Sequence, residues 1–226
     1  MRYKVAIRFR VEGDLRFISH HDTMRLFERA LSRARLPVKY SEGFNPRVRM
    51  SLPLPRPVGV ATSADMLVVE LREPLGASEV LGRLREQMPG GLTLLEAFDL
   101  PSGGKLHPES VGYEAALPEE EIASVRSAVG RLMAADRWLV DRNDEQGRLV
   151  RAIDLRPMLI DASVEGGVLR WSCRVSDEGA ARLAEWLSAF GLDPARTLHR
   201  VRRTAVEWQA RPLPGAVAEP AEAAGV

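Results

Sequence analysis

The alternation between strand-like and helix-like segments constrains the fold of this chain more than any other feature of its sequence. Apolar residues recur with the period of two that is typical of strands at residues 2–11, 47–52, 64–71 and 92–98. They recur with the helical period of three to four at residues 20–36 and 77–88. The resulting order, strand-helix-strand-strand-helix-strand, is typical of the ferredoxin-like arrangement, in which helices cover one face of an antiparallel sheet.

The same order repeats later in the chain, with an extra segment around residues 153–160. Helical periodicity occurs at residues 119–134 and 179–190, and strand-like segments lie at residues 112–117, 137–141, 149–155, 168–175 and 198–208. We therefore expect an α+β protein of two ferredoxin-like (βαββαβ) halves with antiparallel sheets, at residues 1–100 and 109–210. One irregular α+β domain with the same elements is the alternative. Residues 101–108, rich in Gly and Pro, predict a linker, and residues 211–226 predict a disordered tail.

Positive charge is concentrated near the N-terminus. The net charge of the 226 residues is +1, but residues 1–56 hold 13 basic and five acidic side chains. Such a block suggests a local anionic partner, such as nucleic acid or phosphate. Surface arginines encoded by a GC-rich genome would give the same composition without a partner.

Several classes of protein are disfavoured by the composition. The single cysteine, Cys173, excludes a disulfide framework and a cluster held by several thiolates. No apolar run approaches the roughly 20 residues that cross a bilayer, and no secretory signal is visible. We therefore expect a cytoplasmic protein without a membrane partner.

The densest group of chemistry-bearing residues lies around the first predicted helix. Ser19 and Asp22 have the spacing of a capping box, so a helix should begin at His20. A helix N-terminus, arginines and an aromatic ring together suit a phosphodiester or a nucleotide. We predict an anion or nucleic-acid site made of Ser19, His21, Arg25, Arg29, Ser41, Gly43, Phe44, Asn45, Arg47, Arg49, Arg200 and Arg202.

Each of these features also has a purely structural interpretation. Ser19 could serve only as a cap, Phe44 could fill the core, and the basic stretch at residues 199–204 could only solvate a sheet edge. His20 and His21 are the candidates for a catalytic acid or base, although adjacent helical positions point about 100° apart. The four histidines show no metal-ligand spacing, so we expect no metal and no cofactor.

Four stretches of the N-terminal part resemble a known family. They are residues 17–22 (FISHHD), residues 25–37, residues 40–46 (YSEGFNP), and residues 54–60 together with the Ser-Ala-Asp at 63–65. In these stretches the chain resembles the radical-SAM-linked (radical-SAM-associated) family, a domain of unknown function that is fused behind or encoded beside radical-SAM proteins. The match covers most of residues 1–71, with looser echoes at residues 154–157 and near Thr204.

The sequence departs from that family's pattern at two places. His21 stands where an aliphatic residue is usual, and the Arg-Val-Arg run at residues 47–49 replaces a commoner His-Pro-Lys type run. A catalytic histidine after the Gly-Phe-Asn-Pro turn is therefore not expected here. The chain carries no radical-SAM domain, which would make it the stand-alone form.

The resemblance implies a radical-SAM protein as partner and a role in RNA modification. Together with the basic block, it favours an accessory RNA-binding protein, with tRNA as a candidate ligand, that works with a separate radical-SAM enzyme. One alternative is a metal-independent RNA-processing enzyme that uses His20 or His21 as a general acid or base. Another is a protein-interaction scaffold without nucleic acid. Intrinsic catalysis and the oligomeric state stay open at this point.

Overall fold

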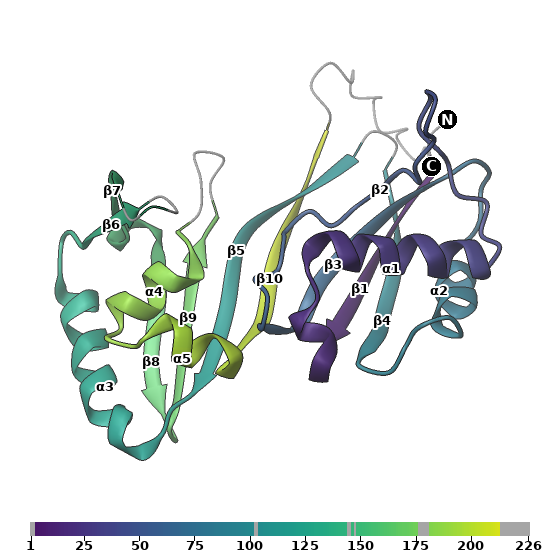
Figure 1. Cartoon of the computed structure of the whole chain (residues 1–226). Coiled ribbons are helices and arrows are strands. Elements are labelled where there is room, and N and C mark those ends of the chain that lie inside the picture. The colour runs from purple at the N-terminus through teal and green to yellow at the C-terminus, as the bar shows by residue number, and fades with distance from the viewer. Residues whose placement is uncertain (1–2, 102–103, 144–145, 147, 176–180, 213–226) are drawn as a thin grey trace, which may run out of the picture.

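The chain is a mixed α+β protein with one large, mostly antiparallel sheet (Figure 1). The computed structural model describes residues 3–101, 104–143, 146, 148–175 and 181–212. Along the sheet the strands follow the order β4 (Leu92–Leu100), β1 (Tyr3–Val11), β3 (Ala61–Leu71), β10 (Val201–Pro212), β5 (Gly104–Ala116), β9 (Val168–Arg174) and β8 (Leu159–Glu165). The short strand β2 (Met50–Ser51) pairs with β3 off this path.

The N-terminal part of the sheet carries its helices on one face. Strands β4, β1, β3 and β2 are antiparallel neighbours in that order. The helices α1 (His20–Arg33) and α2 (Ala77–Arg85) pack on the same face of this sheet. On that face Ile7 and Phe9 of β1 belong to one apolar core with Phe27 and Leu31 of α1. The expected helix start at His20 is confirmed, and the strands expected at 2–11, 64–71 and 92–98 correspond to β1, β3 and β4.

The C-terminal part has its own apolar core. Here the neighbours β10, β5, β9 and β8 are antiparallel, and a separate two-stranded sheet holds β6 (Leu139–Asn143) and β7 (Leu149–Asp154). The helices are α3 (Glu119–Ala134), α4 (Leu183–Ala189) and α5 (Pro194–Thr197). Leu132, Leu169, Trp171, Trp186 and Phe190 pack together inside. Single 3-10 turns lie at η1 (Gly13–Phe17), η2 (Arg156–Met158) and η3 (Leu198–Arg200).

A buried polar joint connects the two parts. Strand β10 pairs with β3 in parallel at Arg202 and Arg203. The guanidinium of Arg203 is 1% exposed and donates a hydrogen bond to Asp65 Oδ1 (2.8 Å) and another to the carbonyl of Pro55 (3.0 Å). Arg56 lies 3.6 Å from the other oxygen of Asp65. Two buried arginines therefore share one carboxylate, and the residues around 54–65 serve this joint.

Part of β5 and β10 reaches over the helix-free face of the N-terminal sheet. Leu106 of β5 and Trp208 of β10 pack there against Ala6, Met66 and Val68. Figure 1 shows the far ends of β5 and β10 running side by side toward β2. This arm covers only part of the face, and a cavity lies beside it.

Several sequence-based expectations need correction. The linker expected at 101–108 is largely strand, because β5 begins at Gly104 and pairs with β10 from there. The tail expected at 211–226 begins two residues too early, since β10 ends at Pro212; residues 213–226 lie outside the described residues. The strand expected at 198–208 starts only at Val201, because Asp193 caps the short helix α5, which η3 follows. The helix expected at 179–190 is α4, which begins only at Leu183 because Arg182 is its extended N-cap; residues 179–180 lie outside the described residues.

Candidate nucleic-acid site beside helix α1

Local hydrogen bonds and one packed face fix the orientation of α1. Ser19 Oγ accepts a hydrogen bond from the backbone N–H of Asp22 (3.1 Å), and Thr23 Oγ1 donates to the carbonyl of Ser19 (2.9 Å). Phe27 is buried, with its ring centroid 5.0 Å from that of Phe9 on β1. The opposite face of the helix is therefore exposed, and it carries His21, Arg25, Arg29 and Arg33 at intervals of four residues.

A groove with a volume of about 890 Å³ lies between α1 and the segment at residues 40–50. The second wall is held by backbone bonds that pair Ser41 with Arg47 and Lys39 with Arg49. Ser41 Oγ also accepts from the N–H of Arg47 (3.0 Å), which fixes the base of the loop between them. The residues that line the groove are His20, His21, Met24, Arg25, Glu28, Arg29, Ser32, Arg33, Tyr40, Pro46, Arg47, Val48 and Met50.

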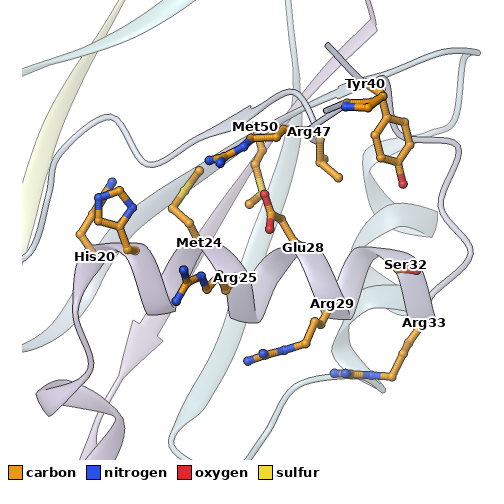
Figure 2. Close-up of a pocket in the computed structure, with 13 residues that line it drawn as sticks. His20, Met24, Arg25, Glu28, Arg29, Ser32, Arg33, Tyr40, Arg47 and Met50 are labelled. Atoms are coloured by element: carbon orange, nitrogen blue, oxygen red, sulfur yellow. The ribbon is translucent and has the colours of Figure 1, made fainter. Parts of the chain in front are cut away.

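Figure 2 shows how the side chains divide the groove. Met24 and Glu28 point from α1 toward Met50, while Arg25 and Arg29 follow one another along the helix. Arg47 reaches across from the second wall to the neighbourhood of Met24. The groove thus has a partly apolar floor and a basic rim that comes from two separate segments of the chain.

Most of the positive charge in the groove is not neutralised within the described chain. No carboxylate oxygen of the described residues lies within 4.0 Å of the guanidinium nitrogens of Arg29, Arg33 or Arg47. Arg25 lies 3.5 Å from Asp22, and Arg33 donates to the carbonyl of Gln87 (3.0 Å). Glu28 is the one acidic residue among those that line the groove. Four arginines against Glu28 and the Asp22 carboxylate beside Arg25 leave a net positive potential that favours anions.

The N-terminus of α1 is not a free anion site. The hydroxyl of Ser19 donates to Asp22 Oδ2 (2.7 Å), and this hydrogen bond is the largest cause of the lowered pKa of Asp22. A negative side chain therefore already occupies the region where we expected the helix N–H groups to bind a phosphate. Ser19 caps the helix, and anion binding would depend on the arginines instead.

The loop between Ser41 and Arg47 contributes less to the groove than expected. Phe44 is fully exposed, so the possibility that it fills the core is wrong. Gly43 has φ +128, a conformation that side-chain-bearing residues rarely adopt, which explains a glycine at this turn. Neither Gly43, Phe44 nor Asn45 lines the groove, whereas the adjoining Arg47 does.

Three arginines of the predicted site lie elsewhere. Arg49 lines a different cavity and lies 3.5 Å from Glu70. Arg200 donates to Glu121 Oε2 (3.0 Å), and Arg202 lies within 4.0 Å of both Glu12 and Glu114. Arg200 and Arg202 thus form ion pairs with carboxylates at the junction of the two parts. They do not join the groove.

The groove also contains residues that the sequence reasoning did not assign to it. Met24 was expected on the core stripe of the helix but is half-buried and lines the groove. Glu28 and Ser32 were missed. The four-residue spacing from Met24 through Glu28 to Ser32 was the available signal, because side chains at that spacing share one helix face.

The two histidines lie at one end of the groove. Their ring centroids are 6.1 Å apart, with the ring planes at 70°. Within the described ranges, no three residues among His, Cys, Asp and Glu gather as a metal site would require. Cys173 is buried, and burial raises the pKa of its thiol to about 12, so it is not a nucleophile at neutral pH. None of the described helices is both long and apolar enough to cross a membrane.

Comparison with known proteins identifies the family of this chain. A solved structure, the small subunit of acetolactate synthase from Thermotoga maritima, aligns over 93% of this chain and 98% of that chain, at 11% identity and a TM-score of 0.26. At that score the likeness carries no conclusion. No curated protein matches the chain. The model of a family described as "Uncharacterized protein conserved in bacteria (DUF2344)" matches residues 4–185, and its description makes no link to radical-SAM proteins. Since this match spans most of the sequence, the chain belongs to the DUF2344 family.

Proposed function

We propose that this protein binds RNA, with tRNA as the leading candidate, through the groove beside α1, as an accessory to a separate radical-SAM enzyme that modifies RNA. The observation that carries the proposal is the basic rim of the groove. Arg29, Arg33 and Arg47 line the groove from two segments of the chain, and no carboxylate among the described residues lies within 4.0 Å of them. Structural arginines usually have such partners, as Arg203 does.

The spacing of the α1 arginines suits a run of phosphates. Arg25, Arg29 and Arg33 lie four residues apart, so successive side chains are separated by about 6 Å along the helix axis. Guanidinium groups bind phosphate through paired hydrogen bonds, and each phosphate that is neutralised releases counterions. Phe44, fully exposed three residues before Arg47, offers a ring on which an unpaired base can stack. These features together favour single-stranded or loop regions of RNA.

The proposal is tested by measuring the affinity for tRNA by fluorescence anisotropy at low salt. We expect the double variant Arg29→Glu with Arg47→Glu to bind at least about tenfold more weakly per residue changed, because a hydrogen bond to a charged group contributes about 1.5–3 kcal/mol. Arg126→Glu is the matched control, since Arg126 is exposed on α3 in the other part of the molecule. An equal loss per residue changed in the two proteins would show that binding follows net charge rather than the groove.

The radical-SAM partner is supported by the sequence resemblance alone. Affinity purification from a native host, with and without nuclease, would test it. Recovery of a radical-SAM protein together with RNA, reduced by nuclease, is the expected result. A complex that survives both nuclease and high salt would instead support the protein-interaction scaffold, and the absence of any radical-SAM protein would contradict the proposed partnership.

An RNA-processing enzyme is the second candidate, because His20 and His21 both line the groove where RNA would lie. One of them would act as a general acid or base, and Arg25 or Arg47 would stabilise the charged transition state. Replacement of the catalytic histidine by Ala would then reduce the rate about 10²-fold or more. RNA that remains intact with the wild-type protein, or activity unchanged in both alanine variants, would remove this candidate.

We infer, in addition, that the chain consists of two ferredoxin-like units that share one sheet. The order β4-β1-β3-β2 supports the first unit and the order β10-β5-β9-β8 supports the second, since each follows the βαββαβ pattern with antiparallel neighbours. The β6–β7 hairpin is then an insertion in the second unit. In this arrangement the groove belongs wholly to the first unit, and the second unit would be free to contact a partner.

A further inference from the structure

A second cavity, of about 480 Å³, lies on the opposite side of β2 from the groove. We call it the β2 pocket. Met50 lines both hollows, so this short strand is the wall between them. The pocket opens on the helix-free face of the N-terminal sheet, where the arm of β5 stops covering it. Its polar lining consists chiefly of Lys4, Arg49, Glu70, Lys105 and His107.

The charges of the β2 pocket do not balance. Lys4 on β1 is paired in register with Glu70 on β3, and its ammonium lies 3.6 Å from Glu70 Oε1. Arg49 lies 3.5 Å from the other oxygen of the same carboxylate. Glu70 is the one acidic residue in the lining, and Lys105 adds a further positive charge from β5. Three cationic residues and a single acidic residue thus line the pocket.

The hydrogen bonds of the buried charges are also incomplete. Lys4 is 7% exposed, and its ammonium has three donors, of which one reaches the carbonyl of Gly104 (3.0 Å). The distance to Glu70 is too long for a second hydrogen bond. Glu70 Oε2 is buried and has no hydrogen-bond partner among the described residues. Because buried charged groups are normally saturated with hydrogen bonds, this is an unusual arrangement for a purely structural ion pair.

An apolar surface adjoins these charges. Met50, Pro53, Val68 and Leu106 line the same pocket. A cavity with an apolar wall and a few convergent polar groups is the usual form of a small-molecule site. The combination fits a ligand with a negative head and a hydrocarbon body.

We propose that the β2 pocket binds a small organic anion, whose carboxylate or phosphate head meets Lys4 and Lys105 while its apolar body lies against Val68 and Leu106. The head would accept the donors that Lys4 leaves unused and would offset the excess positive charge. The inference does not depend on RNA binding in the groove, because the two hollows lie on opposite sides of β2.

Calorimetric titration of the protein with three small molecules tests the proposal: benzoate, phenyl phosphate and the neutral benzyl alcohol. All three carry a benzene ring and differ in their head group. We expect at least one anion to bind and the alcohol not to bind, and the better anion identifies the head. Lys105→Glu should weaken that binding by at least about tenfold, since it reverses one exposed charge of the pocket. Arg47→Glu, a charge reversal on the other side of β2, should change the affinity by less than twofold.

Three results would overturn the proposal. They are the absence of binding by both anions, equal binding by the alcohol, and an affinity that falls with Arg47→Glu but not with Lys105→Glu. Lys105 is exposed, so its substitution should not unfold the protein, and a thermal melt of each variant checks this. Retention of tRNA binding by the Lys105→Glu variant would show that the two sites are independent, whereas its loss would contradict their separation.

Discussion

Arg29 is exposed on α1 at the rim of an open groove, and no carboxylate of the described chain lies within 4.0 Å of it, whereas Arg203 is 1% exposed and donates to Asp65 at 2.8 Å. Both belong to basic stretches of the sequence that look alike. The first side chain leaves its charge available to a ligand, and the second holds two parts of the fold together. An arginine-rich segment therefore indicates a binding surface only where the fold supplies no internal anion.

The two environments also differ in their effect on the stability of the protein. A buried guanidinium must recover its lost hydration from a nearby carboxylate and carbonyls, as Arg203 does from Asp65 and Pro55. An exposed one keeps its water and contributes little to stability. Variants that remove partners should consequently affect folding at β10, and variants that remove arginines should affect ligand binding at α1.

The largest expected effect on stability comes from the joint. Asp65→Ala should lower the free energy of unfolding by about 3–5 kcal/mol, because it leaves Arg203 and Arg56 buried without their shared carboxylate. Denaturant unfolding followed by circular dichroism measures this. Arg29→Met is the matched control and should stay within about 0.5 kcal/mol of the wild type. Similar losses in the two variants would erase the distinction drawn between the two kinds of arginine.

A smaller effect is expected where α1 begins. Ser19→Ala removes the N-cap of the helix that carries the basic rim, and should cost about 1 kcal/mol of unfolding free energy. Arg25 and Arg29 keep their places on the folded helix, so tRNA affinity should be nearly unchanged. A large loss of affinity in the folded variant would mean that Ser19 contacts the ligand directly, against the interpretation of Ser19 as a cap.

The same variant has a consequence for titration. The hydrogen bond from Ser19 is the largest cause of the lowered pKa of Asp22, so Ser19→Ala should raise that pKa toward 3.8. Because the folded-state pKa is lowered, the contribution of this carboxylate is present above the ordinary pKa and is lost as the pH falls through the folded-state value. An NMR titration of the Asp22 carboxyl resonance measures it. An unchanged titration curve would be inconsistent with the hydrogen bond.

The smallest change concerns an arginine paired at the surface. Glu121→Gln releases Arg200 from its carboxylate, and should reduce stability by only about 0.2–1 kcal/mol because both side chains are partly exposed. The freed charge lies outside the groove, so tRNA affinity should not rise. A clear gain in affinity would mean that the RNA surface extends to β10, as the sequence alone predicts.

Local signals predict the starts of α1 and α3 well. The Ser19 cap marks the start of α1, and Pro118 followed by acidic residues marks the start of α3, whose range at 119–134 agrees with the sequence-based expectation. Both signals are contained within one or two helical turns. Strand β8 was not predicted, although a local signal for it exists. Gly166 and Gly167, with φ +55 and +75, form the turn of the β8–β9 hairpin, and this glycine pair was not used as a hairpin signal.

Features that depend on distant partners are not predictable from the sequence in this way. Gly104 and Pro108 are typical of a loop, yet they lie in β5 because β10 pairs with them about a hundred residues later. For the site, the four-residue spacing predicts the arginine row on α1. The sequence around an arginine does not show whether it forms an ion pair, because the partner can lie far along the chain. The partner of Arg203, for example, is Asp65, 138 residues away.

The salt dependence of tRNA binding tests the central claim most directly, because it counts the cations that contact phosphate. A plot of log affinity against log salt concentration should be steep for the wild-type protein and should become shallower by roughly 0.7–0.9 per lost phosphate contact. The double variant Arg29→Ala with Arg47→Ala should therefore reduce the steepness of the slope by the amount expected for two lost phosphate contacts, while Arg126→Ala should leave the slope unchanged. A wild-type slope near zero, or the same slope in all three proteins, would contradict RNA binding through the groove beside α1.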